Sequence, residues 1–86
     1  MNENQKQSVL ITGANGFVGS RLCRKLLTDG YRVIAGVREN CNRELLAGLD
    51  LEFRYGDVCC LETLPAMIKD VDYIIHNAGK IGRAHV

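Results

Sequence analysis

Hydrophobic and polar residues follow two patterns along this chain. Short apolar runs rich in β-branched residues predict strands, and apolar residues three or four apart predict helices. The predicted strands cover residues 8–12, 31–37, 51–55 and 71–77. The predicted helices cover residues 17–29 and about 61–68, with a short helix or turn within 40–50.

The helix over 17–29 carries one apolar stripe and is followed by Gly30, which suits the position just past a helix end. The stripe consists of Val18, Leu22, Cys23, Leu26 and Leu27. Leu61, Leu64 and Ile68 mark the second helix. Pro65 lies among them and lacks a backbone N–H, so we expect this helix to start late or to bend.

Strands that alternate with helices and read as near-continuous apolar runs indicate a parallel sheet buried on both faces. Right-handed crossovers then predict an α/β fold, a Rossmann-like doubly wound sheet with strand order 3-2-1-4. This is the N-terminal half of such a domain, since strands 5 and 6 would lie beyond strand 4. We expect a disordered leader at 1–7 and a partial domain at 8–79.

Composition narrows the function classes. The 86 residues suit one small domain, and the net charge of +1 comes from mixed acids and bases, so neither nucleic acid nor a membrane is an expected partner. No apolar run approaches a membrane span, and the polar N-terminus does not resemble a secretory signal. The four cysteines contain no C-x-x-C pair. We therefore expect reduced thiols, a cytoplasmic protein and no metal site.

The strongest chemical signal is the segment ITGANGFVGS, with Gly13, Gly16 and Gly19 between a strand and a helix. Gly13 allows a sharp turn, Gly16 allows the backbone to approach a pyrophosphate, and Gly19 allows the helix to lie close to the sheet. The N–H groups at the helix start then hold phosphate. The segment predicts dinucleotide phosphate binding; a purely structural turn is the alternative.

The residues from Thr12 to Gly19 resemble the T-G-x-x-G-[FY]-[IV]-G loop of the extended short-chain dehydrogenase/reductase family. This family includes NAD-dependent epimerases and dehydratases and dihydroflavonol-reductase-like enzymes. The resemblance covers residues 8–79 and implies that the loop binds NAD(P). The implied contacts from this loop are Gly13, Asn15, Gly16, Phe17, Val18 and Gly19.

Two later segments match the family in order and spacing. In YGDV, the resemblance implies that Asp57 accepts a hydrogen bond from the adenine amino group and that Val58 touches the ring. HNAG resembles the segment after strand 4 that runs beside the riboses, which implies contacts from Asn77, Ala78 and Gly79. His76 in this segment is read as a hydrogen-bonded core residue in preference to a catalytic one.

The cofactor is expected to be NADP, with NAD as the alternative. NAD-binding members place an acidic residue at the end of strand 2, where this chain has Val37 followed by Arg38. An arginine pairs with a 2′-phosphate, whereas a carboxylate repels it. The alternative for Arg38 is a solvated loop charge, and Glu39 is the residue that would favour NAD. Arg43 is a further candidate phosphate contact.

The catalytic residues of the family are not recognisable in this chain. Family members use a Tyr-x-x-x-Lys pair, but Tyr31, Tyr55 and Tyr73 each lack a lysine four residues later. We therefore expect an inactive fragment of a reductase or epimerase whose substrate is not encoded here and whose parent could be a homodimer. A non-catalytic NAD(P) sensor on the same fold is the alternative.

The last residues, 80–86, end in IGRAHV. Translated back into codons, this string is similar to the start of a widely used sequencing-library adapter followed by a stop codon. We therefore expect a non-native tail and assign no function from Ile81 onward; a genuine short tail is the alternative.

Overall fold

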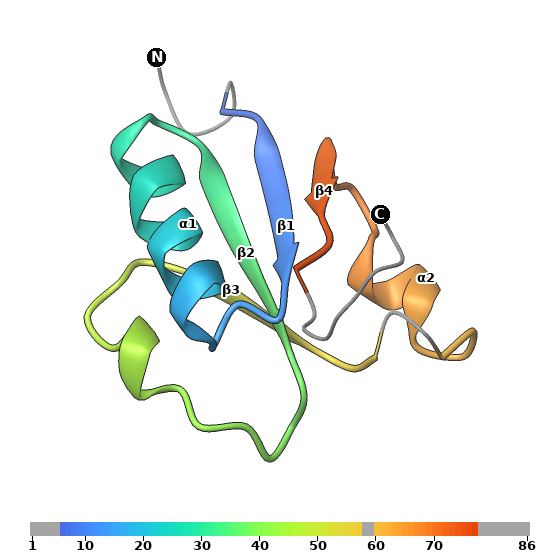
Figure 1. Ribbon diagram of the computed structural model, residues 1–86. Helices are drawn as coiled ribbons and strands as arrows, with labels where there is room; N and C mark the ends of the chain where they lie inside the picture. Colours follow the sequence, from blue (N-terminus) through green and yellow to red (C-terminus); the bar gives the residue numbers. More distant parts are fainter. Residues whose placement is uncertain (1–5, 58–59, 78–86) are drawn as a thin grey trace.

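The computed structural model describes residues 6–57 and 60–77, which form one α/β unit (Figure 1). Its elements in chain order are β1 (Ser8–Thr12), α1 (Phe17–Thr28), β2 (Arg32–Val37), the 3₁₀ helix η2 (Glu44–Leu46), β3 (Glu52–Tyr55), α2 (Leu64–Met67) and β4 (Tyr73–Ile75). Strand β1 has its predicted bounds. Strands β2, β3 and β4 are shorter than predicted, because pairing ends where their outer residues leave the ladder.

The sheet has the order β3-β2-β1-β4, and all its pairs are parallel, which confirms the predicted topology. In the register of the ladder, Leu10 of β1 lies opposite Ile34 of β2 and Ile74 of β4. Parallel neighbours require crossovers, and α1 and α2 supply two of them. Because all the strands run in the same direction, their carboxyl ends meet at one edge of the sheet.

The two faces of the sheet are covered by different elements (Figure 1). Alternate residues of β1 and β2 pack with α1 and η2 in one core cluster, whose buried members are Val9, Ile11, Ala14, Cys23, Val33, Ala35, Val37 and Leu46. On the opposite face, Leu10 and Ile34 pack with Met67 of α2. Because the residues of a strand point alternately to the two faces, β1 and β2 bury both of theirs.

The outer strands are less buried than the two central strands. Tyr73 and Ile74 of β4 are each 51% exposed, as expected for an unpaired edge strand, and Tyr55 of β3 is 42% exposed. The prediction of a sheet buried on both faces therefore holds for β1 and β2 alone. Ile74 lies opposite Leu10, on the face that α2 covers with only four residues. Tyr73 lies opposite Val9, on the face of α1, and is exposed because no further strand flanks β4 in the described sheet.

Helix α1 ends as its sequence predicts. Gly30 has a φ of 95°, in the left-handed region that favours glycine. The Gly30 N–H donates to the Leu27 carbonyl, and the Tyr31 N–H donates to the Leu26 carbonyl. These two bonds form a Schellman motif, which satisfies the last carbonyl groups of the helix. Val18, which the sequence placed on the buried stripe, is 61% exposed because it lies at the helix start, beyond the sheet.

Helix α2 starts late, at Leu64, with Pro65 in its first turn, as expected. Leu61 precedes it and is 83% exposed, so its assignment to the buried side was wrong. Arg54 of β3 anchors the other end of the helix. Its Nη1 donates to the carbonyl oxygens of Met67 at 2.9 Å and Lys69 at 2.7 Å. A cation at a helix carboxyl end complements the carbonyl groups that the helix leaves unpaired.

Strands β1 and β4 are tied together at their amino ends by side chains. The Ser8 N–H donates to Asp72 Oδ2 at 2.8 Å, and the Ser8 hydroxyl donates to the Asp70 carbonyl at 3.1 Å. Asp70 has a φ of 59°, which turns the chain into β4. No helix in the described ranges is long and apolar enough to cross a membrane.

Candidate dinucleotide-binding site

A cleft of about 580 Å³ lies at the carboxyl ends of the strands. Open α/β sheets bind their ligands at this edge, and the volume falls within the usual range for small-molecule sites. Its lining comes from segments that follow or end the four strands. The lining residues are Thr12, Gly13, Asn15, Gly16, Phe17, Val18, Gly36, Val37, Arg38, Cys41, Gly56, Asp57, Met67 and Asn77.

The glycine loop has the geometry that its spacing predicts. Gly13 has a φ of 63°, which lets the chain leave β1 in a sharp turn. A Cβ on Gly19 would lie 2.3 Å from the Gly13 carbonyl oxygen and 2.7 Å from the Ala14 Cα, so only glycine fits there. A Cβ on Gly16 would have one neighbour within 4 Å, the Gly13 oxygen at 3.7 Å. Packing within the protein thus requires glycine at position 19 and not at position 16.

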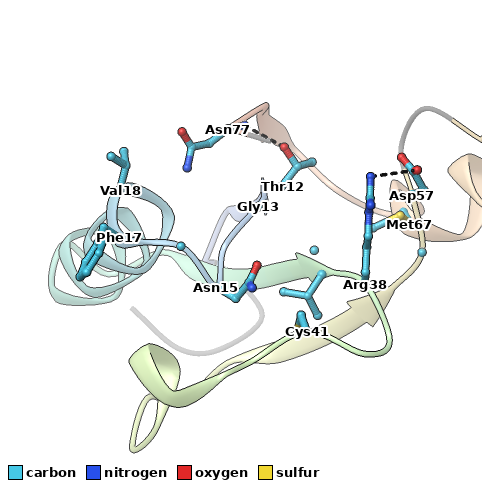
Figure 2. Close-up of a pocket in the computed structure, with 14 residues that line it drawn as sticks. Thr12, Gly13, Asn15, Phe17, Val18, Arg38, Cys41, Asp57, Met67 and Asn77 are labelled. Carbon is cyan, nitrogen blue, oxygen red and sulfur yellow. Dashed lines mark hydrogen bonds and ion pairs between the residues drawn. The ribbon is translucent and has the colours of Figure 1, made fainter. Parts of the chain in front are cut away.

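The start of α1 faces the cleft. Gly16 is the N-cap residue and provides no side-chain cap, and no acidic residue occupies the first turn. The first N–H groups of a helix have no partner within the helix, and the helix dipole makes this end positive. Phe17 and Val18, 76% and 61% exposed, lie at this end of the cleft (Figure 2). The arrangement suits a phosphate group.

Arg38 and Asp57 lie at the opposite end of the cleft (Figure 2). Arg38 Nη2 is 3.4 Å from Asp57 Oδ2, and the two side chains are 80% and 42% exposed. Thr63 fixes the backbone of Asp57: its Oγ1 accepts the Asp57 N–H at 3.1 Å and donates to the Asp57 carbonyl at 2.6 Å. The charged pair is therefore held on a fixed backbone but is open to solvent.

Thr12 joins the first and last strands at the edge of the cleft. Its Oγ1 accepts the Asn77 N–H at 2.8 Å and lies 2.9 Å from His76 Nδ1. Asn77 lines the cleft. His76 is hydrogen-bonded as expected, but its exposed side chain shows that it is not a core residue. Three other predicted contacts, Val58, Ala78 and Gly79, lie outside the described residues.

Several lining residues were missed by the sequence reasoning. Met67 is 2% exposed and reaches the cleft between the ends of β2 and β3. A Cβ on Gly36 would lie 3.2 Å from Met67 Cε, and one on Gly56 would lie 3.0 Å from Met67 Sδ. A glycine at a strand end often marks the close approach of another group, so these glycines were the available signal. Thr12 and Cys41 also line the cleft, and only Thr12 belonged to a recognised motif.

Arg43 is not brought to the described lining of the cleft. Its guanidinium lies 5.6 Å from the ring centroids of Phe53 and Tyr55, and it contacts the Tyr55 hydroxyl. Arg43 thus stacks on aromatic rings, for which a planar guanidinium is well suited, and its role as a further phosphate contact stays a prediction.

Comparison with known proteins agrees with this geometry. Residues 9–86 match the NAD dependent epimerase/dehydratase family. Dihydroflavonol 4-reductase of Zea mays is 56% identical over 39 residues, which are 45% of this chain and 11% of that protein. Epimerase Mth375 of Methanothermobacter thermautotrophicus superposes with a TM-score of 0.72 at 32% identity, covering 87% of this chain and 23% of that one.

The dTDP-glucose 4,6-dehydratase of Bacillus anthracis, solved in complex with NAD, superposes with a TM-score of 0.72 at 25% identity, over 86% of this chain and 27% of that one. The chain spans about a quarter of the length of the curated relatives that it matches over most of its own length. The match to the family extends over nearly the whole sequence, and the strand order and glycine loop agree with it. The chain therefore belongs to the NAD dependent epimerase/dehydratase family of extended short-chain dehydrogenases/reductases.

Proposed function

We propose that this chain is the cofactor-binding part of an NAD(P)-dependent reductase or epimerase and that it prefers NADP. The observation that carries the proposal is one continuous cleft with a glycine loop and open helix start at one end and Arg38 at the other. A dinucleotide has its phosphates between two nucleosides, so the part of a site that holds its adenosine half needs anion-binding groups at one end and room for adenosine at the other.

In this proposal the pyrophosphate lies at the start of α1, where backbone N–H groups donate to it. The adenine end lies near Asp57, whose carboxylate accepts a hydrogen bond from the exocyclic amino group. Asn77 lies beside a ribose, between β1 and β4. When bound, the cofactor supplies the hydride chemistry; this chain binds and orients its adenosine and phosphate groups.

The preference for NADP rests on which of the two charged residues that follow β2 borders the cleft. Arg38 lines it, whereas Glu39 is exposed and is not among the described lining residues. A guanidinium offers several N–H donors, so Arg38 can pair with a 2′-phosphate. The Arg38–Asp57 pair is exposed and therefore contributes little stability, so a phosphate can compete for the guanidinium.

We also propose that the chain by itself catalyses no turnover. Among the described residues, the cleft lining includes no tyrosine. Tyr31 packs against the core, Tyr55 stacks with Phe53, and Tyr73 lies on the open edge strand. The general acid or base of the family would come from a longer parent protein. If a parent protein lacks a Tyr-x-x-x-Lys pair, the non-catalytic sensor becomes the better description.

Fluorescence titration of the 86-residue chain with NADPH and NADH tests this function. We expect the wild type to bind NADPH more tightly than NADH. Arg38→Gln should raise the Kd for NADPH by about tenfold and change the Kd for NADH by less than about threefold. Arg21→Gln is the matched control, since it removes one positive charge from the exposed face of α1. Equal affinity for both cofactors, with no effect of Arg38→Gln, would contradict the NADP preference; failure to bind either would contradict the function.

A further inference from the structure

The hydrogen bonds around Thr12 assign a role to a residue outside the described cleft lining. The Thr12 hydroxyl is 2.8 Å from the Asn77 backbone nitrogen and 2.9 Å from His76 Nδ1. Thr12 is 3% exposed, so its hydroxyl needs hydrogen-bond partners within the protein. A hydroxyl has one donor and two acceptor positions. The Asn77 N–H uses one acceptor position of the hydroxyl. The imidazole Nδ1 either accepts the hydroxyl proton or donates to the second acceptor position, according to its tautomer.

We propose that His76 is a positioning residue for the cofactor site, an inference that rests on the proposed function of the cleft. By bonding to Thr12 Oγ1, the Nδ1 atom of His76 holds the threonine side chain in the rotamer that receives the Asn77 N–H. The bond between the Thr12 hydroxyl and the Asn77 N–H in turn fixes the residues after β4 relative to the glycine loop. His76 thereby sets the distance between two walls of the cleft that belong to strands 64 residues apart in sequence.

The position of these bonds explains why they are needed. The last paired residues of β1 and β4 are Ile11 and Ile75, so the ladder ends one residue before Thr12. Beyond that point, the Thr12–Asn77 bond takes over from the ladder (Figure 2). Gly13 follows Thr12 directly, with its left-handed φ of 63°. Movement of the Thr12 side chain would therefore disturb both the loop and the turn that lines the cleft.

Burial separates this role from a general packing role. The His76 side chain is exposed, so replacing its ring removes little buried apolar surface. The same two strands are also tied at their amino ends, where the Ser8 hydroxyl donates to the Asp70 carbonyl at 3.1 Å and the Asp72 N–H donates back to Ser8 Oγ at 3.0 Å. Ser8 is remote from the cleft lining. The two ends of one strand pair thus provide a test and its control.

The test compares His76→Asn with His76→Gln in the 86-residue chain. The asparagine Oδ1 occupies nearly the place of Nδ1 and can accept the Thr12 proton, whereas the longer glutamine places its amide near the position of Nε2. We expect His76→Asn to keep the Kd for NADPH within about twofold and His76→Gln to raise it about fivefold. Ser8→Ala should lower the unfolding temperature but leave this Kd unchanged.

Amide hydrogen exchange without cofactor provides a second readout that does not depend on the proposed function. We expect the Asn77 N–H to exchange faster in His76→Gln than in the wild type and in His76→Asn. Equal affinity and equal Asn77 exchange in the two variants would overturn the positioning role. So would a loss of affinity in Ser8→Ala as large as that in His76→Gln, since the effect would then be one of strand pairing alone.

Discussion

Substituting alanine for each of two glycines in the loop should separate packing from ligand binding. A Cβ on Gly19 would lie 2.3 Å from the Gly13 carbonyl oxygen, with backbone atoms of Ala14 also in contact. An ordinary carbon–oxygen contact is about 1 Å longer, and backbone cannot rotate away as a side chain can. In an unhindered helix interior, glycine to alanine would stabilise by about 1 kcal/mol. In Gly19→Ala the overlap with the backbone should outweigh this gain, so that the substitution destabilises the folded protein by about 2–3 kcal/mol.

Gly16→Ala should behave in the opposite way. The added Cβ would meet only the Gly13 oxygen, at 3.7 Å, and Gly16 has a φ of −83°, which alanine adopts without strain. Alanine is a poorer N-cap residue than glycine, but it also reduces the entropy of the unfolded chain, so stability should change by less than about 1 kcal/mol. A methyl group where a pyrophosphate must approach should weaken NADPH binding by about tenfold or more.

Thermal unfolding followed by circular dichroism and NADPH fluorescence titration check both variants. For a domain of this size, the expected loss in Gly19→Ala corresponds to a midpoint lower by roughly 10–20 °C. Gly16→Ala should unfold within a few degrees of the wild type while binding poorly. A Gly19→Ala protein as stable as the wild type would refute the packing argument, and unchanged affinity in Gly16→Ala would refute the phosphate assignment.

Three further predictions follow from burial, helix capping and the open sheet edge. Burial raises the pKa of the Cys23 thiol from 9.0 to about 11. The protonated thiol therefore contributes its full stability below about pH 9, and this contribution is lost as the pH rises toward 11. In urea unfolding between these pH values, the free energy of unfolding should fall more steeply with pH in the wild type than in Cys23→Ala. Arg54→Leu removes the bonds to the Met67 and Lys69 carbonyls and should cost about 1–3 kcal/mol in urea unfolding, with Arg54→Lys intermediate. The exposed β4 edge should make the chain self-associate in sedimentation velocity, and Ile74→Lys should reduce this association; a monodisperse wild-type monomer would contradict the prediction.

Much of the architecture could be predicted from the sequence because its signals are local. The apolar run of β1, the stripe of α1 and the glycine after it each specify conformation within a few residues. Parallel strands and right-handed crossovers then leave few possible strand orders, and the predicted one is present. The glycine spacing also predicted the sharp turn at Gly13 and the close contact at Gly19, since both depend on the absence of a nearby Cβ.

Sequence patterns were less informative where the role of a residue depended on an element boundary or on a neighbouring strand. Leu61 has the spacing of a helical stripe, yet it is 83% exposed because α2 begins only at Leu64. Arg43 has a charge that suits phosphate, but the aromatic rings of β3 hold it away from the cleft. In both cases the pattern was real. The late start of α2 determined the exposure of Leu61, and the neighbouring strand β3 determined the position of Arg43.

The sequence by itself determined the fold, the edge of the sheet where the cleft lies, and the loop that borders it. Only the tertiary structure decided which side chains meet there: Met67 between two strand ends, Arg38 beside Asp57, and the Thr12 hydroxyl between His76 and Asn77. Turns and helix stripes depend on neighbours in sequence, which can be read directly. These contacts join residues up to 65 positions apart in sequence. They depend on strand register and on the side-chain rotamers that packing selects.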